Sequence, residues 1–383
     1  MHHGRGQARR PRGRPLTRDA VLAARWIVGP RFDLAWFFGG ALVAGLAVPA
    51  LLALGVSIVA IFWGWLLLVD GPHLGATLVR TYADRQEWRE RRALLLGSLA
   101  AFLVGPLFLL AGALTGSRQP FTAYLGLAAL YGFFHVVRQH WGFVALYRAK
   151  NGEHDRPGLD AWTVYVGCWA PYLHFMLVHP LARTLVDLPP EPGPVARGLA
   201  ALCVVAFALA ALSFVVRARG ASLPRAGYVL LTLGLYGAIY FGVARLEPIY
   251  DRPRGPDEAF MLISVMTAVF HGVQYVALVA AHGARRYAAP GVDFGPARAL
   301  AATPARLAVT LLLFSLGPYL GMAALTGVFP GLHPFSEATL GPVSVNEVGL
   351  CLWWGQALHH YVLDARIWRV RGDARLRQDL GLA

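Results

Sequence analysis

Residues 353–364 read WWGQALHHYVLD and close a long apolar segment near the end of the chain. At the period of a helix, Gln356, His360 and Asp364 fall on one stripe, and His359 lies about 100° around the helix from His360. Polar side chains at this depth of a membrane are costly unless they face a partner, a metal or water. We therefore expect the stripe to face the interior of a helical bundle, where its histidines help to hold a metal ion.

The composition of the whole chain indicates an integral membrane protein. Of its 383 residues, 56% are hydrophobic and only 15% are charged. Apolar segments of about 20 residues recur along it, which is the length that a membrane-spanning helix needs. We predict an all-α, polytopic transmembrane bundle of about ten spans, at about residues 34–54, 56–79, 93–115, 121–148, 159–182, 195–217, 225–246, 257–283, 305–328 and 345–368.

The arginines predict how the chain crosses the membrane. The net charge is +14, but the basic residues lie at the ends of apolar segments and form no compact face interleaved with aromatics, so no nucleic-acid partner is expected. They concentrate after the even-numbered spans, which places both termini in the cytoplasm of a bacterial-type inner membrane. We expect a basic, disordered arm over residues 1–33, a membrane domain over 34–368 and a basic tail over 369–383.

Most histidines fall on the even-numbered spans. At about 1.5 Å per residue, all of them except His282 lie roughly 9–20 Å from the cytoplasmic boundary, in one layer of the inner half of the bilayer. Distant segments that converge on one depth are what a site between bundled helices requires. The histidines of these spans are His73, His135, His140, His271, His282, His359 and His360.

Residues 70–73, DGPH, interrupt the second span. Pro72 removes a backbone donor and disturbs the preceding turn, so we expect a kink that turns His73 inward. We expect His73 to bind a metal or to support a ligand, with Asp70 as a ligand or an orienting group. The alternative is a kink whose polar groups satisfy one another.

The fourth span carries His135 and Gln139 on one face, while His140 lies about 140° away from His135. Both histidines cannot face one ion from a straight helix. We expect His135 to be the ligand because it lies deeper in the membrane, and we leave the role of His140 open. Arg138 lies in the same layer and needs an anionic partner, for which Asp70, Asp364 or a carboxylated substrate would serve.

The eighth span carries His271, Gln274 and His282 along one stripe, with Gly272 allowing a neighbouring helix to approach. His271 and His282 lie about 16 Å apart along the axis, too far to share an ion. We expect His271 to be the ligand and His282 to lie at the membrane interface, although a ligand role for His282 stays open.

The donor set restricts the chemistry. Cys168, Cys203 and Cys351 lie within apolar segments and form no CxxC pair, so we expect no disulfide and no thiolate site. Imidazoles and carboxylates suit iron, zinc, copper or manganese. Oxygen chemistry on apolar substrates requires a redox metal, which favours iron. The sequence contains no HExxH, GxGxxG or Walker motif, so a zinc protease or a nucleotide-binding protein is not indicated.

Four motifs carry a resemblance to known families: residues 70–73 (DGPH), 134–139 (FHVVRQ), 271–275 (HGVQY) and 359–369 (HHYVLDARIWR). They look like signatures of a poorly characterised group of polytopic bacterial membrane proteins. In broader terms they resemble the histidine-rich membrane oxygenases, which include fatty-acid desaturases, hydroxylases and alkane monooxygenases. The acid followed by Pro-His is similar to the Brp/Blh-type carotene dioxygenases, which use iron. The HxxxH and HxxHH boxes are absent, so the number of metal ions and the reaction stay open.

These observations predict a membrane-embedded, non-haem iron oxygenase or desaturase that acts on a lipid, a carotenoid or another long apolar substrate. A soluble electron donor would dock on the arginine-rich inner face. The alternatives are a histidine-relay transporter or proton-coupled carrier, and a haem protein with His135 and His271 as axial ligands. The expected ligands of one or two irons are His73, His135, His271, His359 and His360; the expected acid, base or charge-bearing residues are Asp70, Asp364 and Arg138; the residues expected to hydrogen-bond the ligands are Gln139, Gln274 and Gln356.

Overall fold

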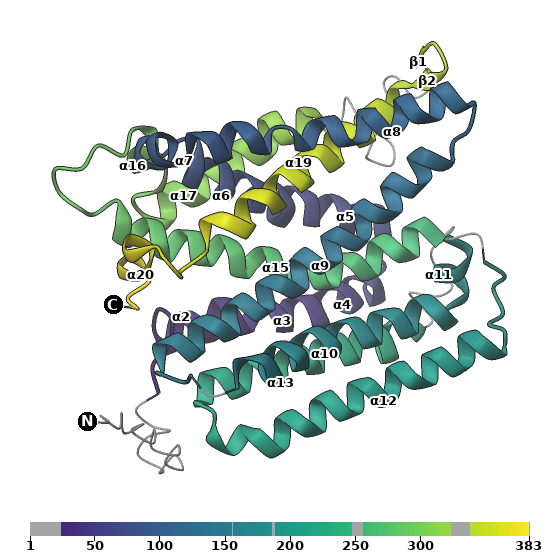
Figure 1. Cartoon of the computed structure of the whole chain (residues 1–383), viewed down its shortest axis with the longest axis horizontal. Coiled ribbons are helices and arrows are strands. Elements are labelled where there is room, and N and C mark those ends of the chain that lie inside the picture. Colours follow the sequence, from purple (N-terminus) through teal and green to yellow (C-terminus); the bar gives the residue numbers. More distant parts are fainter. Residues whose placement is uncertain (1–23, 155, 186–187, 247–255, 323–337, 383) are drawn as a thin grey trace, which may run out of the picture.

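Long helices packed side by side make up the protein (Figure 1). The computed structural model describes residues 24–154, 156–185, 188–246, 256–322 and 338–382. Within these ranges the β-structure is one short hairpin, β1 (Thr339–Leu340) with β2 (Val343–Ser344). The predicted all-α helical bundle is therefore confirmed.

The first part of the chain forms two rods that are interrupted by π-helical turns, followed by three longer helices. The rods matter for the site because a π turn widens a helix and changes the direction of its side chains. The elements are α2 (Pro30–Phe32), η1 (Asp33–Phe38), α3 (Gly39–Leu42), η2 (Val43–Ala47) and α4 (Val48–Ala53); α5 (Ile58–Trp65), η3 (Leu66–Asp70) and α6 (Gly71–Thr81); then α7 (Arg85–Ser98), α8 (Ala101–Thr115) and α9 (Gln119–Lys150).

The second part begins with a long helix and ends in a short helix that packs on the bundle. Its elements are α10 (Pro157–Val178), α11 (Pro180–Leu185), α12 (Pro194–Arg217), η4 (Ala218–Gly220), α13 (Leu223–Gly237), η5 (Ala238–Gly242) and η6 (Val243–Arg245); α15 (Pro256–Arg286), α16 (Pro296–Ala301), α17 (Pro304–Phe314) and η7 (Ser315–Tyr319); then α19 (Val345–Ile367) and α20 (Ala374–Asp379).

Eight of the described helical segments are long and apolar enough to cross a membrane, so the chain is a multi-pass membrane protein. The predicted total of about ten also counted α10 and α19, which are not among the eight. Both are long enough but less apolar: α10 carries Asp160, and α19 carries two histidines, Asp364 and Arg366. Both nevertheless pack along apolar helices, α10 against α12 and α19 against α8.

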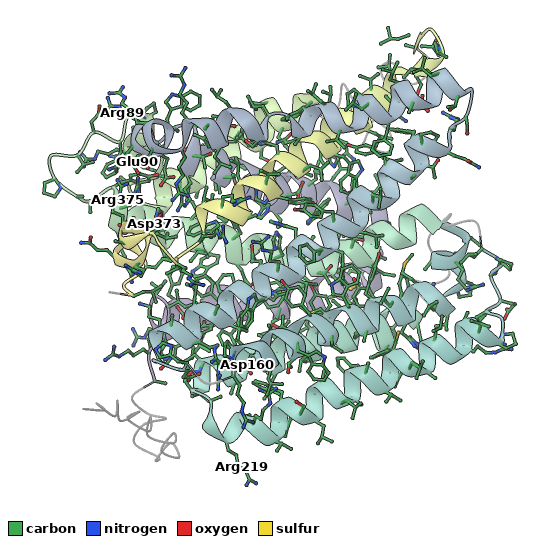
Figure 2. The ribbon with its side chains drawn as sticks, in the orientation of Figure 1. Arg89, Glu90, Asp160, Arg219, Asp373 and Arg375 are labelled. Atoms are coloured by element: carbon green, nitrogen blue, oxygen red, sulfur yellow. The ribbon has the colours of Figure 1, made fainter. Side chains whose placement is uncertain are left out.

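The two ends of the described chain lie at the same end of the bundle, where α2 and α20 are found (Figure 1). Arg89, Arg219 and Arg375 project there as well (Figure 2). Most of the predicted arm lies outside the described residues, but its last part packs on the bundle. Ile27 is buried, and the carboxylate of Asp33 accepts the backbone N–H groups that precede α2.

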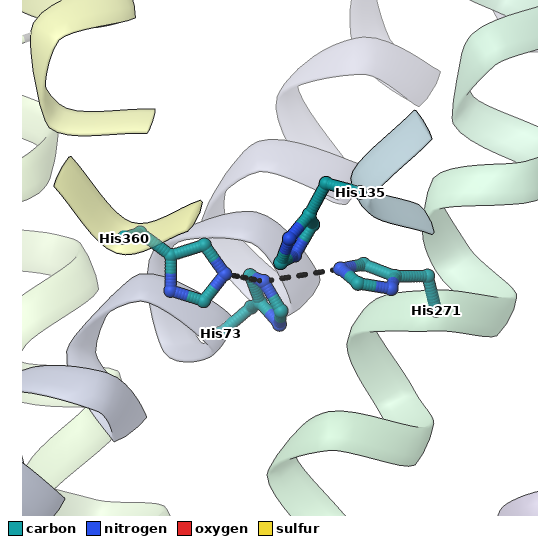
Figure 3. Close-up of side chains that lie close together, drawn as sticks. All are labelled: His73, His135, His271 and His360. Atoms are coloured by element: carbon teal, nitrogen blue, oxygen red, sulfur yellow. Dashed lines mark hydrogen bonds between the residues drawn. The ribbon is translucent and has the colours of Figure 1, made fainter. Parts of the chain in front are cut away.

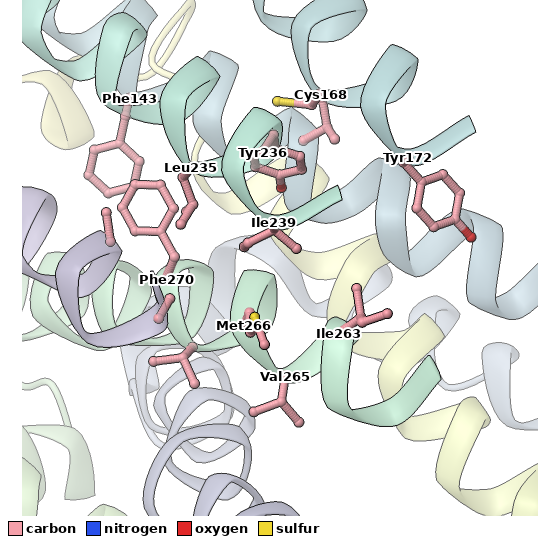
Figure 4. Close-up of a cluster of buried hydrophobic side chains, with 14 of the residues drawn as sticks. Phe143, Cys168, Tyr172, Leu235, Tyr236, Ile239, Ile263, Val265, Met266 and Phe270 are labelled. Atoms are coloured by element: carbon pink, nitrogen blue, oxygen red, sulfur yellow. The ribbon is translucent and has the colours of Figure 1, made fainter. Parts of the chain in front are cut away.

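The main core lies where α9, α10, α13 and α15 meet (Figure 4). Phe143, Tyr236, Met266 and Phe270 are fully buried there. The same packing brings α15 against the rod of α5, η3 and α6. A Cβ added at Gly272 would lie 2.6 Å from Val69 Cγ1, which confirms the predicted close approach. The absence of a side chain at this position lets α15 bring His271 next to α6.

The predicted disturbance before His73 is also found. The π turn η3 ends at Asp70, and α6 starts with Gly71 and Pro72. Pro72 is tolerated in the first turn of a helix, where a backbone donor has no intrahelical partner. The combination of a π turn and a new helix start directs His73 into the interior, where it is 4% exposed.

Candidate metal centre

Four imidazoles from four separate helices meet at one point in the bundle (Figure 3). One ring nitrogen of each lies within 4.8 Å of those of the other three. All four side chains are buried, so the cluster is shielded from lipid and from water. The four residues are His73 on α6, His135 on α9, His271 on α15 and His360 on α19.

The ring nitrogens face one another at short distances. His73 Nε2 lies 2.7 Å from His360 Nε2 and 3.3 Å from His271 Nε2. The ring of His135 is centred 4.9 Å from that of His271 and 5.0 Å from that of His360. Two imidazoles bound to one ion at about 2.1 Å hold their nitrogens about 3 to 3.5 Å apart. The spacing of the four rings is therefore near that of a mononuclear site.

The hydrogen bonding of these nitrogens fits a site for a cation among them. Among the described residues, His73 Nε2 and His271 Nε2 have only histidine nitrogens as partners, and His135 Nε2 has no hydrogen-bond partner. A neutral imidazole has one N–H donor and one lone pair. Four such rings that meet at one point cannot satisfy all of their facing nitrogens by hydrogen bonds to one another, and a metal ion bound among them would accept a lone pair from each ring.

A chain of hydrogen bonds fixes the orientation of His360. Asp364 Oδ1 accepts the hydroxyl of Tyr275 at 2.6 Å, so Tyr275 must in turn accept from Thr77 Oγ1, which lies 2.6 Å away. Thr77 then accepts from His360 Nδ1–H at 2.7 Å. A carboxylate can only accept, and this sets the direction of every bond in the chain. The lone pair of His360 is therefore on Nε2, which faces the other histidines.

This chain of hydrogen bonds indicates that Asp364 orients His360 rather than binding a metal ion itself. Its Oδ2 lies 3.5 Å from His360 Nε2 and 3.9 Å from His135 Nε2. Carboxylates that hold a metal-binding histidine in place, directly or through other groups, are common beside metal sites. Asp70 does not reach the cluster, because its carboxylate accepts the hydroxyl of Tyr319.

The three glutamines take different places. Gln139 Nε2 donates to the backbone carbonyl of His271 at 2.9 Å, and this bond ties α9 to α15 at the cluster. Gln274 instead accepts from Tyr228 and donates to the carbonyl of Phe37, so it holds the neighbouring helices together and makes no contact with the four histidines. Gln356 is half-buried, one turn before His360.

The structure does not bring His359 to the other four histidines, although it was expected there as a ligand. Its Nε2 lies 2.8 Å from the hydroxyl of Tyr82. The physical reason is that adjacent residues of a helix point about 100° apart. His360 occupies the direction toward the cluster, and His359 faces Tyr82, which follows α6, and Phe102 on α8.

Two further histidines have other partners. Both ring nitrogens of His140 contact tyrosine hydroxyls, Nδ1 with Tyr228 at 3.1 Å and Nε2 with Tyr236 at 3.2 Å. His282 Nε2 lies 3.3 Å from the carboxylate of Asp379 on α20. Neither belongs to the cluster, in agreement with the preference for His135 and His271 on their helices.

A cavity of about 340 Å³ adjoins the cluster between α9, α15 and α19. His135, Tyr275 and Asp364 are among the residues that line it. Most of the remaining lining is apolar or aromatic, and the ring of Tyr361 stacks on His135 with centroids 4.2 Å apart. Of the four clustered histidines, His135 lines the cavity, so a molecule bound there would contact one imidazole of the cluster.

Sequence reasoning assigned no part to Tyr275 or Tyr361. A signal for Tyr275 was present: each of the four clustered histidines is followed, four residues on, by a polar residue. These pairs are His73 with Thr77, His135 with Gln139, His271 with Tyr275, and His360 with Asp364. Residues four apart lie on one helix face, so the pattern places a polar layer one turn beyond the imidazoles.

The fold and the site define the class: a multi-pass helical membrane protein with a buried cluster of four histidines. No protein-family model, no curated protein and no solved structure matches the chain.

Proposed function

We propose that the four clustered histidines hold one iron ion and that the protein is a membrane oxygenase or desaturase for a lipid, a carotenoid or another long apolar substrate. The observation that carries this proposal is the convergence of four imidazole nitrogens within 4.8 Å beside an apolar cavity. Imidazoles alone suit iron, copper, zinc and manganese. Iron is preferred because the reaction of an unactivated hydrocarbon needs a redox metal, which supplies the activation of dioxygen when bound.

The chain itself would bind, orient and shield. His73, His135, His271 and His360 would bind the ion, and the burial of their rings would exclude bulk water. The hydrogen bonds from His360 through Thr77 and Tyr275 to Asp364 would keep one ligand in the correct tautomer. Tyr275 also lies beside His73, with ring centroids 4.5 Å apart, so its hydroxyl can hold a proton close to the substrate.

In this proposal α10 and α19 also cross the membrane, which gives ten spans and two cytoplasmic termini in a bacterial-type inner membrane. The support is the common end of the bundle at which α2, α20 and several arginines lie. A soluble electron donor with an acidic surface would dock at this basic end.

The two alternatives fit the geometry less well. A haem needs an open plane between two axial ligands, whereas four imidazoles here surround a single point. A histidine relay for transport needs a path of polar groups toward both faces, whereas the cavity beside the histidines is mainly apolar.

The direct experiment is metal analysis of anaerobically purified protein, together with mass spectrometry of the lipids that copurify with it. We expect about one iron per chain in the wild type. His271→Ala and His360→Ala should remove it, while His140→Phe, which removes an equally buried histidine, should keep it. Sub-stoichiometric metal in the wild type, or an unchanged metal content in the two alanine variants, would overturn the proposal.

A further inference from the structure

Arg138 is an exposed charge at depth in the membrane. It lies on α9, about 18 Å from the last residue of that helix, Lys150. Its side chain is exposed rather than buried in the bundle. An arginine at such a depth is unfavourable unless an anion or water accompanies it.

No described carboxylate forms an ion pair with Arg138, although the charge of Arg138 acts on the nearby Asp364. The hydrogen bond of Arg138 in the described part of the chain is a long one of 3.4 Å from Nη2 to the carbonyl of Ala365. Asp364 was the expected partner, but its carboxylate accepts from Tyr275. Asp70, the other candidate, accepts from Tyr319.

The guanidinium lines the same cavity as the histidine cluster. Arg138 and Arg369 both border it, and both are exposed. Asp364 is the one carboxylate in the lining. Its Oδ2 lies 3.9 Å from His135 Nε2. The cavity therefore combines two positive charges with apolar and aromatic walls that lead to the imidazoles.

We propose that this cavity binds a long-chain carboxylate, with its head group on Arg138 and its hydrocarbon chain against the apolar walls beside His135. A carboxylate matches the planar fork of a guanidinium, which can donate two parallel hydrogen bonds to it. This assignment names the substrate class of the proposed reaction and so rests on the proposed function, but binding of the carboxylate needs no metal.

The test is equilibrium binding of radiolabelled stearate to the full chain in phosphatidylcholine nanodiscs, corrected with empty nanodiscs. Methyl stearate has the same chain without the charge, and lysophosphatidate offers a phosphate head instead. Arg138→Gln removes the charge, and Arg138→Lys keeps the charge without the fork. Arg219→Gln is the matched control, because Arg219 is an exposed arginine (Figure 2) that does not line the cavity.

The wild type should bind stearate at least about tenfold more tightly than its methyl ester, as expected for a charge-assisted hydrogen bond. Arg138→Gln should abolish that difference, Arg138→Lys should reduce it, and Arg219→Gln should leave it unchanged. Equal binding of acid and ester by the wild type would overturn the proposal, and so would a preference for lysophosphatidate alone. The wild-type comparison of acid and ester stands even if Arg138→Gln does not fold.

The same binding is measured before and after treatment with a chelator, which separates the two proposals. Unchanged stearate binding after the chelator would show that the carboxylate site is independent of the metal, whereas tight stearate binding by wild-type protein that contains no metal as purified would reject the iron site and retain the carboxylate site. Stoichiometric iron in a protein that binds acid and ester equally would do the reverse.

Discussion

The four clustered histidines form one set of buried histidines and His140 forms a second, and the surroundings of the two sets differ. His140 follows His135 on α9 by just over one turn, and both are buried. The two nitrogens of His140 contact the hydroxyls of Tyr228 and Tyr236, whereas His135 faces three other imidazoles. Burial alone therefore does not mark a metal ligand. The distinguishing feature is whether the ring nitrogens have partners or face one another.

The largest expected effect separates the two sets directly. Replacing His271 or His360 by alanine removes one of four donors, so metal affinity should fall by more than the 10- to 100-fold typical of lost supporting residues. His140→Phe should retain the wild-type metal content, because its imidazole lies outside the cluster. Elemental analysis of each variant, purified in parallel, makes the comparison. Loss of metal in His140→Phe alone would reverse our assignment of the two sets.

The next effect concerns the hydrogen-bond chain to His360. Tyr275→Phe breaks the link from Asp364 to Thr77, which leaves the tautomer of His360 unset, so metal affinity should fall roughly 10- to 100-fold. Tyr236→Phe removes the same hydroxyl from a tyrosine that contacts His140, and it should leave metal affinity unchanged. Competition with a chelator of known affinity measures both. An equal change of metal affinity in the two variants would show that the hydrogen bonds from Asp364 to His360 have no specific role in metal binding.

A smaller effect should follow when the close approach of α15 is disturbed. Gly272→Ala places a Cβ 2.6 Å from Val69 Cγ1, so we expect a loss of about 1–3 kcal/mol from overpacking and a weaker metal site. Gly142→Ala on α9 adds the same methyl group where nothing lies within 4 Å, and it should be neutral. Thermal unfolding in detergent reports the stability. A neutral Gly272→Ala variant would mean that α15 and the rod of α5, η3 and α6 can move apart at no cost.

The smallest effect concerns the docking of α20. Burial alone would raise the pKa of Asp379, but its hydrogen bond with His282 and the charge of Arg286 outweigh this and lower the pKa below 3.8. A lowered folded pKa contributes stability that is complete above pH 3.8 and lost as the pH falls through the folded value.

Asp379→Asn should therefore increase hydrogen exchange in residues 374–379 at pH 7. Asp373→Asn tests the second ion pair that holds this segment, which Asp373 forms with Arg91. Lowering the pH below the folded value should mimic Asp379→Asn in the wild type. Unchanged exchange in both cases would show that Asp379 does not hold α20 in place.

Much of the fold followed from the sequence, because its periodic apolar segments have one stable arrangement in a membrane. Hydropathy located the helices, and proline and glycine marked the disturbance before His73 and the close contact at Gly272. The number of spans was harder to predict, since α10 and α19 carry polar residues whose burial depends on their neighbours. Where each described tail or loop packs, as with α20, depends on ion pairs between residues far apart in the sequence.

The site was predictable in composition more than in orientation. Depth along each helix placed His73, His135, His271 and His360 in one layer, together with His140 and His359. The helix angle showed that His135 and His140 cannot both face one ion, and the greater depth of His135 favoured it. The helix angle left His359 and His360 unresolved, because the rotation of a helix about its axis is set by packing. The polar residue four positions after each clustered histidine would have resolved it: Asp364 follows His360, whereas Leu363 follows His359.

The most direct measurement is X-ray absorption at the iron edge of protein purified without oxygen. Our account predicts about one iron per chain, surrounded by nitrogen atoms at about 2.1 Å with the multiple scattering of imidazole rings, and loss of this signal in His271→Ala and His360→Ala. A protein without bound metal, or one whose iron keeps the same nitrogen shell in both variants, would contradict it.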